Sequence, residues 1–112
     1  MRRYKMVVYS RPTAGREVEY NDWYQNVHLA ELVALPGIVS ARRFRHARNL
    51  VEGAAYPYMS IYEIETDDID AVLNTLRDTA DRGALTMSDA IDLTDTSALV
   101  YEEFGSVVSA LS

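Results

Sequence analysis

The sequence predicts an α+β fold in which a four-stranded antiparallel sheet carries two helices on one face. Segments with strand composition and segments with helical periodicity follow one another in the order strand, helix, strand, strand, helix, strand. In addition, 48% of the 112 residues are hydrophobic, which is enough for one core of ordinary size. We therefore expect a single domain spanning residues 1–112.

Four strands are expected, near residues 4–10, 37–46, 56–65 and 97–104. Aromatic and β-branched residues dominate the first and third runs, YKMVVY and YPYMSIYEI, which is typical of strands. The second run, IVSARRFR, is more polar and is typical of an edge strand. Because only a short loop separates the second and third strands, we expect them to pair as a hairpin.

Two helices are expected, near residues 16–34 and 67–82. The first must end before Pro36 and Gly37, because the residue that precedes a proline is disfavoured in helical geometry. The second has Thr66 as a good N-cap and Gly83 as its C-terminal cap.

The order of these elements is the split βαβ arrangement, βαββαβ, of ferredoxin-like folds. One sheet face is then covered by helices and the other is bare. Residues 84–96 separate the second helix from the last strand without clear periodicity. A connection of that length indicates a functional loop, a lid or a short extra helix.

Composition narrows the classes of function. The chain has no cysteine, which excludes disulfides and thiolate sites and favours a cytoplasmic location. It has only two histidines, His28 and His46, so we expect no metal site rich in histidine. No apolar run approaches the roughly 18 residues that span a membrane. The net charge of −6 argues against nucleic acid as a partner.

The charges are unevenly distributed along the chain. Residues 1–48 hold nine Lys and Arg against four Asp and Glu, whereas residues 49–112 hold two against thirteen. The second strand carries Arg42, Arg43 and Arg45, with Arg48 just beyond it, and the last strand carries Glu102 and Glu103. Both strands are sheet edges in this topology. We therefore predict a homodimer in which basic and acidic edges meet across a two-fold axis while the bare faces pack together.

The first helix contains the best candidate for a catalytic group. On a helical projection its apolar residues form one broad arc, made up of Tyr20, Trp23, Tyr24, Val27, Leu32, Ala34 and Leu35, and Leu29 lies opposite. His28 and Glu31 lie inside this arc, where unpaired charges are costly. His28 is the natural general acid or base, and Glu31 could orient its ring or share its proton. The alternative is a hydrogen-bonded His–Glu pair in the core, and both interpretations stay open.

Three further side chains are candidates for contact with a ligand, and each has a structural alternative. Trp23 and Tyr24 could form a platform for the ligand or simply fill the core. Tyr62 comes from a central strand, like Tyr9 and Tyr58, and a tyrosine facing the helices would place its hydroxyl in a pocket. Arg43 could bind a carboxylate or enolate oxygen, or belong to a charged edge.

The run YNDWYQNVHLAELVALPGIVSARRF, followed by YMSIYEIE, resembles the dimeric α/β-barrel proteins and, among them, the EthD-like branch. The matching features are Trp23–Tyr24, His28 four residues after Tyr24, Pro36–Gly37 at the helix end, and Arg43–Phe44 on the next strand. The resemblance implies a homodimer whose sheets close a barrel, with a pocket between sheet and helices in each subunit. The superfamily includes cofactor-free monooxygenases, lactone isomerases and proteins without known activity, so it does not determine the reaction.

We expect a small cofactor-independent enzyme that acts on a hydrophobic cyclic or aromatic oxygenated molecule. His28 would move a proton next to a carbonyl, in an isomerase, lyase or monooxygenase type of reaction. The alternative is a non-catalytic domain that binds a small molecule or dimerises.

Overall fold

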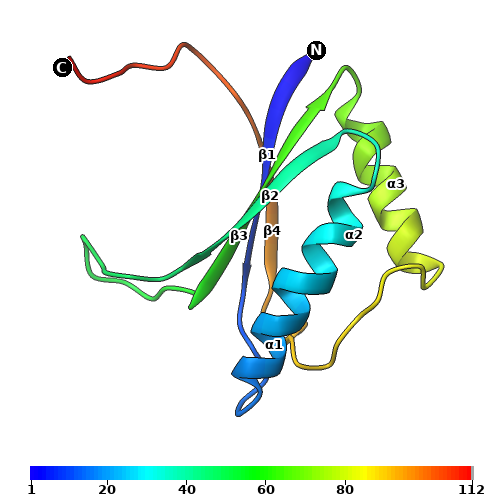
Figure 1. Cartoon of the computed structure of the whole chain (residues 1–112). Coiled ribbons are helices and arrows are strands. Elements are labelled where there is room, and N and C mark those ends of the chain that lie inside the picture. The colour runs from blue at the N-terminus through cyan, green and yellow to red at the C-terminus, as the bar shows by residue number, and fades with distance from the viewer. Residues whose placement is uncertain (112) are drawn as a thin grey trace.

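The computed structural model describes residues 1–111 and contains the predicted elements in the predicted order (Figure 1). The first helical segment consists of α1 (Glu17–Trp23), a π-helical turn η1 (Tyr24–His28) and α2 (Leu29–Val33), and the second helix is α3 (Ile69–Asp81). The strands are β1 (Arg2–Ser10), β2 (Ile38–Arg45), β3 (Tyr58–Thr66) and β4 (Ser97–Glu102). Every expected boundary lies within two residues of the observed one.

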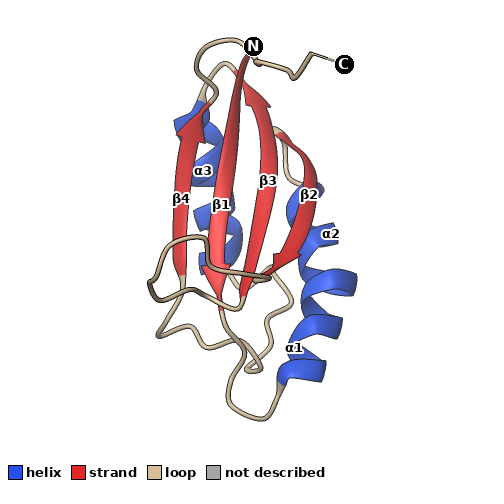
Figure 2. Ribbon diagram, turned by 90° about the vertical axis from the view of Figure 1, so that its left-hand side faces the viewer, coloured by secondary structure: helices blue, strands red, loops and turns tan. Residues whose placement is uncertain are grey.

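The sheet has the strand order β2-β3-β1-β4, and all neighbouring strands are antiparallel (Figure 2). The hairpin between β2 and β3 is therefore confirmed, as are the positions of β2 and β4 at the two edges. Both helices lie on the same side of the sheet (Figure 1). The fold is the four-stranded ferredoxin-like α+β arrangement that the sequence predicts.

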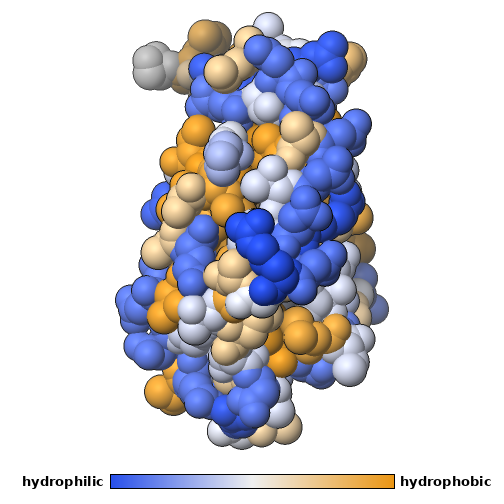
Figure 3. All heavy atoms as spheres, turned by 90° about the vertical axis from the view of Figure 1, so that its right-hand side faces the viewer, coloured by the Kyte–Doolittle hydropathy of each residue, from blue (hydrophilic) through white to orange (hydrophobic). Residues whose placement is uncertain are grey.

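The core lies between the sheet and the helices. Side chains alternate along β1 and β3, so that every second residue is buried beneath the helices. The helices contribute mainly aromatic and leucine side chains to this layer, namely Tyr20, Trp23, Tyr24, Leu29 and Leu32. The outer face of the helix layer is mostly hydrophilic, with scattered hydrophobic residues (Figure 3).

The first helix differs from a uniform α-helix at η1. The Leu29 amide donates to the Tyr24 carbonyl five residues earlier, which makes this turn about one residue longer than an α-helical turn. The residues that follow are consequently rotated relative to an ideal projection. Leu29, expected opposite the apolar arc, is buried, and Ala34, expected on the arc, is exposed. Both expectations were wrong because the projection assumed 3.6 residues per turn throughout.

The N-cap of the second helix lies two residues after the expected one, Thr66. Asp68 is the N-cap, and its side chain accepts a hydrogen bond from the Ala71 amide at 3.1 Å. Thr66 instead accepts a hydrogen bond from the Asp68 amide, so the prediction of Thr66 as N-cap was wrong. Gly83 has a φ of +72° just after the helix, in agreement with its expected capping role. Within residues 1–111, no helix combines the length and the apolar composition needed to cross a bilayer.

Gly37, between α2 and β2, is predicted to be the most restrictive glycine. Its φ is +89°, and an added Cβ would lie 2.7 Å from Cγ2 of Val72, a buried and conformationally stiff residue of α3. Gly37→Ala should therefore lower the free energy of unfolding in urea by about 2–4 kcal/mol. Gly15→Ala is the matched control, because Gly15 has a φ of +78° but nothing within 4 Å of the added Cβ. Equal losses in the two variants would disprove the close approach to Val72.

Candidate functional site between the first helix and the sheet

Trp23, Tyr24 and His28 form an aromatic cluster at the π-helical turn. The His28 ring stacks on Trp23, with 4.7 Å between ring centroids and 25° between the planes. It also meets Tyr24 almost perpendicularly at 5.0 Å. The longer turn of η1 thus places a histidine between two buried aromatic rings, and such π-helical turns often occur at functional sites.

The imidazole of His28 has a buried nitrogen that the described residues leave without a hydrogen bond. Its Nδ1 atom is buried and has no hydrogen-bond partner among residues 1–111. Burial lowers the pKa of His28 from 6.5 to about 4, and the nearby Glu31 charge offsets only a small part of this effect. The ring is therefore neutral at pH 7 and keeps a nitrogen available to accept a proton or to form a hydrogen bond.

Glu31 is engaged with the connection between α3 and β4 rather than with His28. Its two carboxylate oxygens accept hydrogen bonds from the Thr86 amide, at 2.8 Å, and the Thr86 hydroxyl, at 2.9 Å. The Trp23 indole donates to the Thr86 carbonyl at 2.7 Å. These three bonds hold Thr86 against the first helix, and the expected hydrogen-bonded His28–Glu31 pair is not formed.

The connection itself, residues 84–96, contains no helix, so the option of a short extra helix is excluded for this segment. It is fastened at a second point, where the Thr13 amide donates to the Ala90 carbonyl at 2.6 Å and its hydroxyl to the Asp89 carbonyl at 2.7 Å. Ala90 and Ile91 within it are buried in the core, so this end of the connection is fixed by packing. The stretch around Thr86, which hydrogen bonds hold to the first helix, is the part that can move as a lid.

Tyrosine hydroxyls join the first helix to the sheet. Tyr20 is hydrogen-bonded to Ser10 of β1, and Tyr24 to Ser60 of β3 at 2.7 Å. Tyr62 of β3 donates to the Tyr24 hydroxyl at 3.4 Å. Burial raises the pKa values of Tyr20 and Tyr62, so both stay protonated at neutral pH.

Arg43 of β2 lies under the same helix, inside a cage of three tyrosines. Its guanidinium carbon is 4.7 Å from the ring centroid of Tyr24, 5.3 Å from that of Tyr58 and 5.4 Å from that of Tyr20. One terminal nitrogen donates to the side-chain oxygen of Asn21 at 2.8 Å. Asn21 in turn donates to the Tyr58 hydroxyl at 3.1 Å.

The structure brings five of the six predicted site residues into one cluster around Tyr24, namely Trp23, Tyr24, His28, Arg43 and Tyr62. Trp23, Tyr24 and Tyr62 are buried there, and Glu31 lies beyond Trp23, on Thr86. Asn21 was not among the predicted site residues, although its position seven residues before His28 places it on the same side of the helix. No pattern in the sequence of residues 84–96 indicated that Thr86 would be hydrogen-bonded to the first helix.

Among the cavities of residues 1–111 that we describe, the one nearest this cluster is an open groove of about 260 Å³ beside Arg43. It lies where α1 meets the β2 edge and is lined by Asn21, Arg43, Phe44, Arg45 and Tyr58. His28 does not line it, and the ring of Tyr24 lies between the two.

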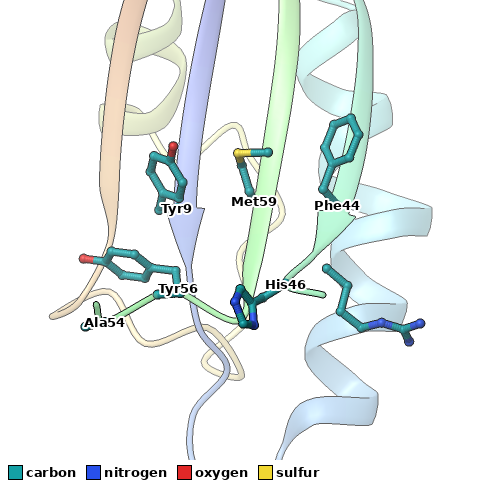
Figure 4. A pocket seen from close by; sticks show the side chains of 8 residues that line it. Tyr9, Phe44, His46, Ala54, Tyr56 and Met59 are labelled. Carbon is teal, nitrogen blue, oxygen red and sulfur yellow. The ribbon is translucent and has the colours of Figure 1, made fainter. Parts of the chain in front are cut away.

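A second cavity, of about 470 Å³, lies on the opposite face of the sheet (Figure 4). Tyr9, Phe44 and Met59 project into it from three strands, while His46, Ala54 and Tyr56 come from the connection between β2 and β3. Tyr9 thus faces away from the helices, whereas Tyr58 and Tyr62 face them. Within residues 1–111, no three His, Asp or Glu side chains are grouped closely enough to hold a metal ion.

The low pKa of His28 should make the protein less stable in mild acid. The unfolded chain binds a proton on this residue below pH 6.5 but the folded chain only near pH 4, so stability falls as the pH drops between these values. At about 1.4 kcal/mol per pH unit, the full loss is about 3 kcal/mol. Urea unfolding at pH 4.5 and 7 should show most of this difference in the unmodified protein and in His46→Gln, but not in His28→Gln. The same pH dependence in His28→Gln would contradict the assignment.

Comparison with known proteins finds similarity in structure alone. No family model and no curated protein matches the sequence. A protein from Shewanella loihica PV-4 that carries the name "putative monooxygenase" superposes with a TM-score of 0.59 and 13% identity, over 95% of this chain and 99% of that one. An EthD family protein from Bacillus halodurans C-125 superposes with a TM-score of 0.54 and 14% identity, over 93% of this chain and 100% of that one. HapK from Hahella chejuensis superposes with a TM-score of 0.50 and 22% identity, over 98% of this chain and 99% of that one.

These superpositions cover nearly the whole of each chain, so no additional domain contributes to the match. At 13–22% identity they establish the fold and not the activity. The resemblance seen in the sequence is thereby confirmed at the level of architecture: the chain has the fold of EthD-like proteins.

Proposed function

We propose that this protein is a small cofactor-independent enzyme that moves a proton on a hydrophobic, cyclic or aromatic oxygenated molecule. The observation that carries the proposal is the buried Nδ1 atom of His28, which has no hydrogen-bond partner among the described residues. Buried polar atoms without partners are rare in folded proteins and destabilise them. A nitrogen kept neutral and unbonded beside two aromatic rings is suited to accept a proton from a bound ring compound.

In this mechanism, His28 removes a proton from the carbon next to a carbonyl group of the substrate. The electron pair of that bond moves toward the carbonyl oxygen, which gains negative charge. For Arg43 to stabilise that oxygen, the substrate must extend past the Tyr24 ring, because Tyr24 lies between His28 and Arg43. The protonated His28 then returns the proton, either to the same carbon, which is simple exchange, or to a conjugated carbon, which completes an isomerisation.

Trp23, Tyr62 and Glu31 act in this proposal as positioning residues. Trp23 supports the His28 ring, and Tyr62 holds the Tyr24 hydroxyl. Glu31 and Trp23 hold Thr86, and with it the connection 84–96. Substrate would reach His28 when the stretch around Thr86 moves away from the helix.

Exchange of substrate protons with solvent deuterium tests the proposal directly. A panel of aromatic ketones and lactones in D₂O, followed by proton NMR, should contain compounds whose proton next to the carbonyl is exchanged by the protein. His28→Gln should slow this exchange by about 100-fold or more, whereas His46→Gln should leave it unchanged. The rate should rise through about pH 4 and stay level toward pH 8, because the base is neutral above its pKa.

The proposal fails if no compound of the panel exchanges, or if His28→Gln remains fully active. The second candidate function, a non-catalytic binding or dimerisation domain, would then be favoured. A specific observation supports this second candidate: the sheet face opposite the helices exposes apolar side chains, beside charged ones such as Lys5 and Arg42, and carries the cavity of Figure 4.

We also propose that the chain forms a homodimer through this open sheet face. Its surface includes Val7, Phe44, Ile61, Leu99 and Tyr101, and partly exposed apolar faces of this kind are typical of interfaces. Figure 1 shows that the β2–β3 connection and the C-terminal segment extend beyond the domain on the same side of the sheet. The radius of gyration, 15.4 Å, exceeds the about 13 Å of a compact chain of this length, which is consistent with projecting segments.

The charged edges contribute less to this dimer than the sequence suggested. Glu102 and Glu103 at the β4 edge already pair with Arg2 and Lys5 of the same chain, at 3.7 and 3.2 Å. Apolar contact must therefore supply most of the stability of the dimer.

Light scattering at micromolar concentration should give twice the monomer mass. Leu99→Glu, which places a charge on the open face, should shift the protein to monomer. Val18→Glu is the matched control, because Val18 is 86% exposed on α1, in the opposite layer, and should leave the mass unchanged. A monomer in the unmodified protein would refute the dimer, and an unchanged mass in Leu99→Glu would refute this choice of face.

A further inference from the structure

The groove beside Arg43 has features that the proton-transfer proposal does not explain. Arg43 and Arg45 both line it from alternate positions of β2, and Arg45, the last residue of the strand, also borders the cavity of Figure 4. The Cα of Arg45 is paired with that of Tyr58 across the β2–β3 ladder, and Tyr58 also lines the groove. Two guanidinium groups and an aromatic wall thus meet in one opening at the sheet edge.

Neither arginine is neutralised within the described chain. The side-chain ion pairs of residues 1–111 use Arg2, Lys5, Arg11 and Arg16 as cations. The carboxylate of Glu17 reaches the Tyr58 hydroxyl, at 3.1 Å, but it is separated from Arg43 by the neutral Tyr58 and Asn21.

Arg43 is also fixed in place before any ligand arrives. Three tyrosine rings and Asn21 hold its guanidinium, while two of its five N–H groups are directed to Asn21. The remaining N–H groups form no hydrogen bond with residues 1–111. A planar, immobilised guanidinium with free donors matches the geometry of a carboxylate and loses little entropy on binding it.

We propose that this groove binds the carboxylate of a small aromatic acid, with Arg43 and Arg45 at the charged end and Tyr58 against the ring. The volume of about 260 Å³ lies just below the range of drug-sized pockets, so a single-ring ligand fits it better than a larger one. The inference rests on the proposed function only for the claim that the bound acid is a substrate or product. Binding itself requires neither His28 nor turnover.

Calorimetric titration of the unmodified protein with benzoate, benzamide and inorganic phosphate tests this inference. Benzoate should bind at least about tenfold more tightly than benzamide, which has nearly the same shape but no charge. It should also bind more tightly than phosphate, which has charge but no ring. Equal affinity for benzoate and benzamide, or tighter binding of phosphate, would overturn the proposal.

Variants of β2 locate the site. Arg45→Gln, at an exposed position that the fold tolerates, should weaken benzoate binding severalfold. Arg43→Lys should weaken it by about tenfold, because lysine keeps the charge but loses the planar fork. Arg42→Gln is the matched control: Arg42 is on the same strand but lines a cavity on the opposite face, so its loss should have no effect. An equal loss in Arg42→Gln, or no loss in Arg45→Gln, would contradict the assignment.

His28→Gln separates this inference from the proposed function. It should bind benzoate as tightly as the unmodified protein while losing proton exchange. Benzoate binding without any exchange in the unmodified protein would support the anion site and refute the catalytic proposal. Exchange without benzoate binding would do the reverse.

Discussion

The packing of the first helix on the sheet depends on tyrosine hydroxyls that are buried and must find partners there. A buried hydroxyl without a hydrogen bond costs more than its ring gains from a slightly better position, so the pairs determine how the helix sits. The Tyr20 hydroxyl is hydrogen-bonded to Ser10 of β1. The Tyr24 hydroxyl is hydrogen-bonded to Ser60 and Tyr62 of β3. A helix held at two central strands cannot slide along the sheet or rotate without breaking these bonds.

The π-helical turn follows immediately after these two tyrosines. Because Tyr24 is fixed to β3, the extra residue of the wider turn changes the direction of everything that comes later. It brings Leu29 into the core and sets His28 between Trp23 and Tyr24. A rigid hydroxyl network therefore supports a histidine whose Nδ1 atom has no partner of its own. In this arrangement the helix keeps a polar group that contributes nothing to folding, which is expected of a site and not of a packing residue.

A cation, Arg43 of β2, also lies beneath the first helix, and its neighbours are neutral groups. Three tyrosine rings, and no carboxylates of residues 1–111, surround Arg43. Arg2 and Lys5 of β1, in contrast, form ion pairs with Glu102 and Glu103. Aromatic rings and an amide stabilise a guanidinium without cancelling its charge. Tyr24 contacts both His28 and Arg43, so the proposed proton acceptor and the proposed anion-binding group share one aromatic neighbour.

The sequence by itself determined the order of the elements, the hairpin of β2 and β3 and the edge strands, and it indicated His28, Arg43 and their aromatic neighbours as candidate site residues. These follow from local patterns: strand composition, helical spacing and the breaks at Pro36 and Gly83. Tertiary structure alone decided that Glu31 binds Thr86, that Tyr9 faces away from the helices and that Leu29 is buried. Each depends on a contact between distant segments or on a turn that departs from ideal periodicity. A single-sequence projection contains neither, because it assumes a uniform helix and assigns no side chain its partner.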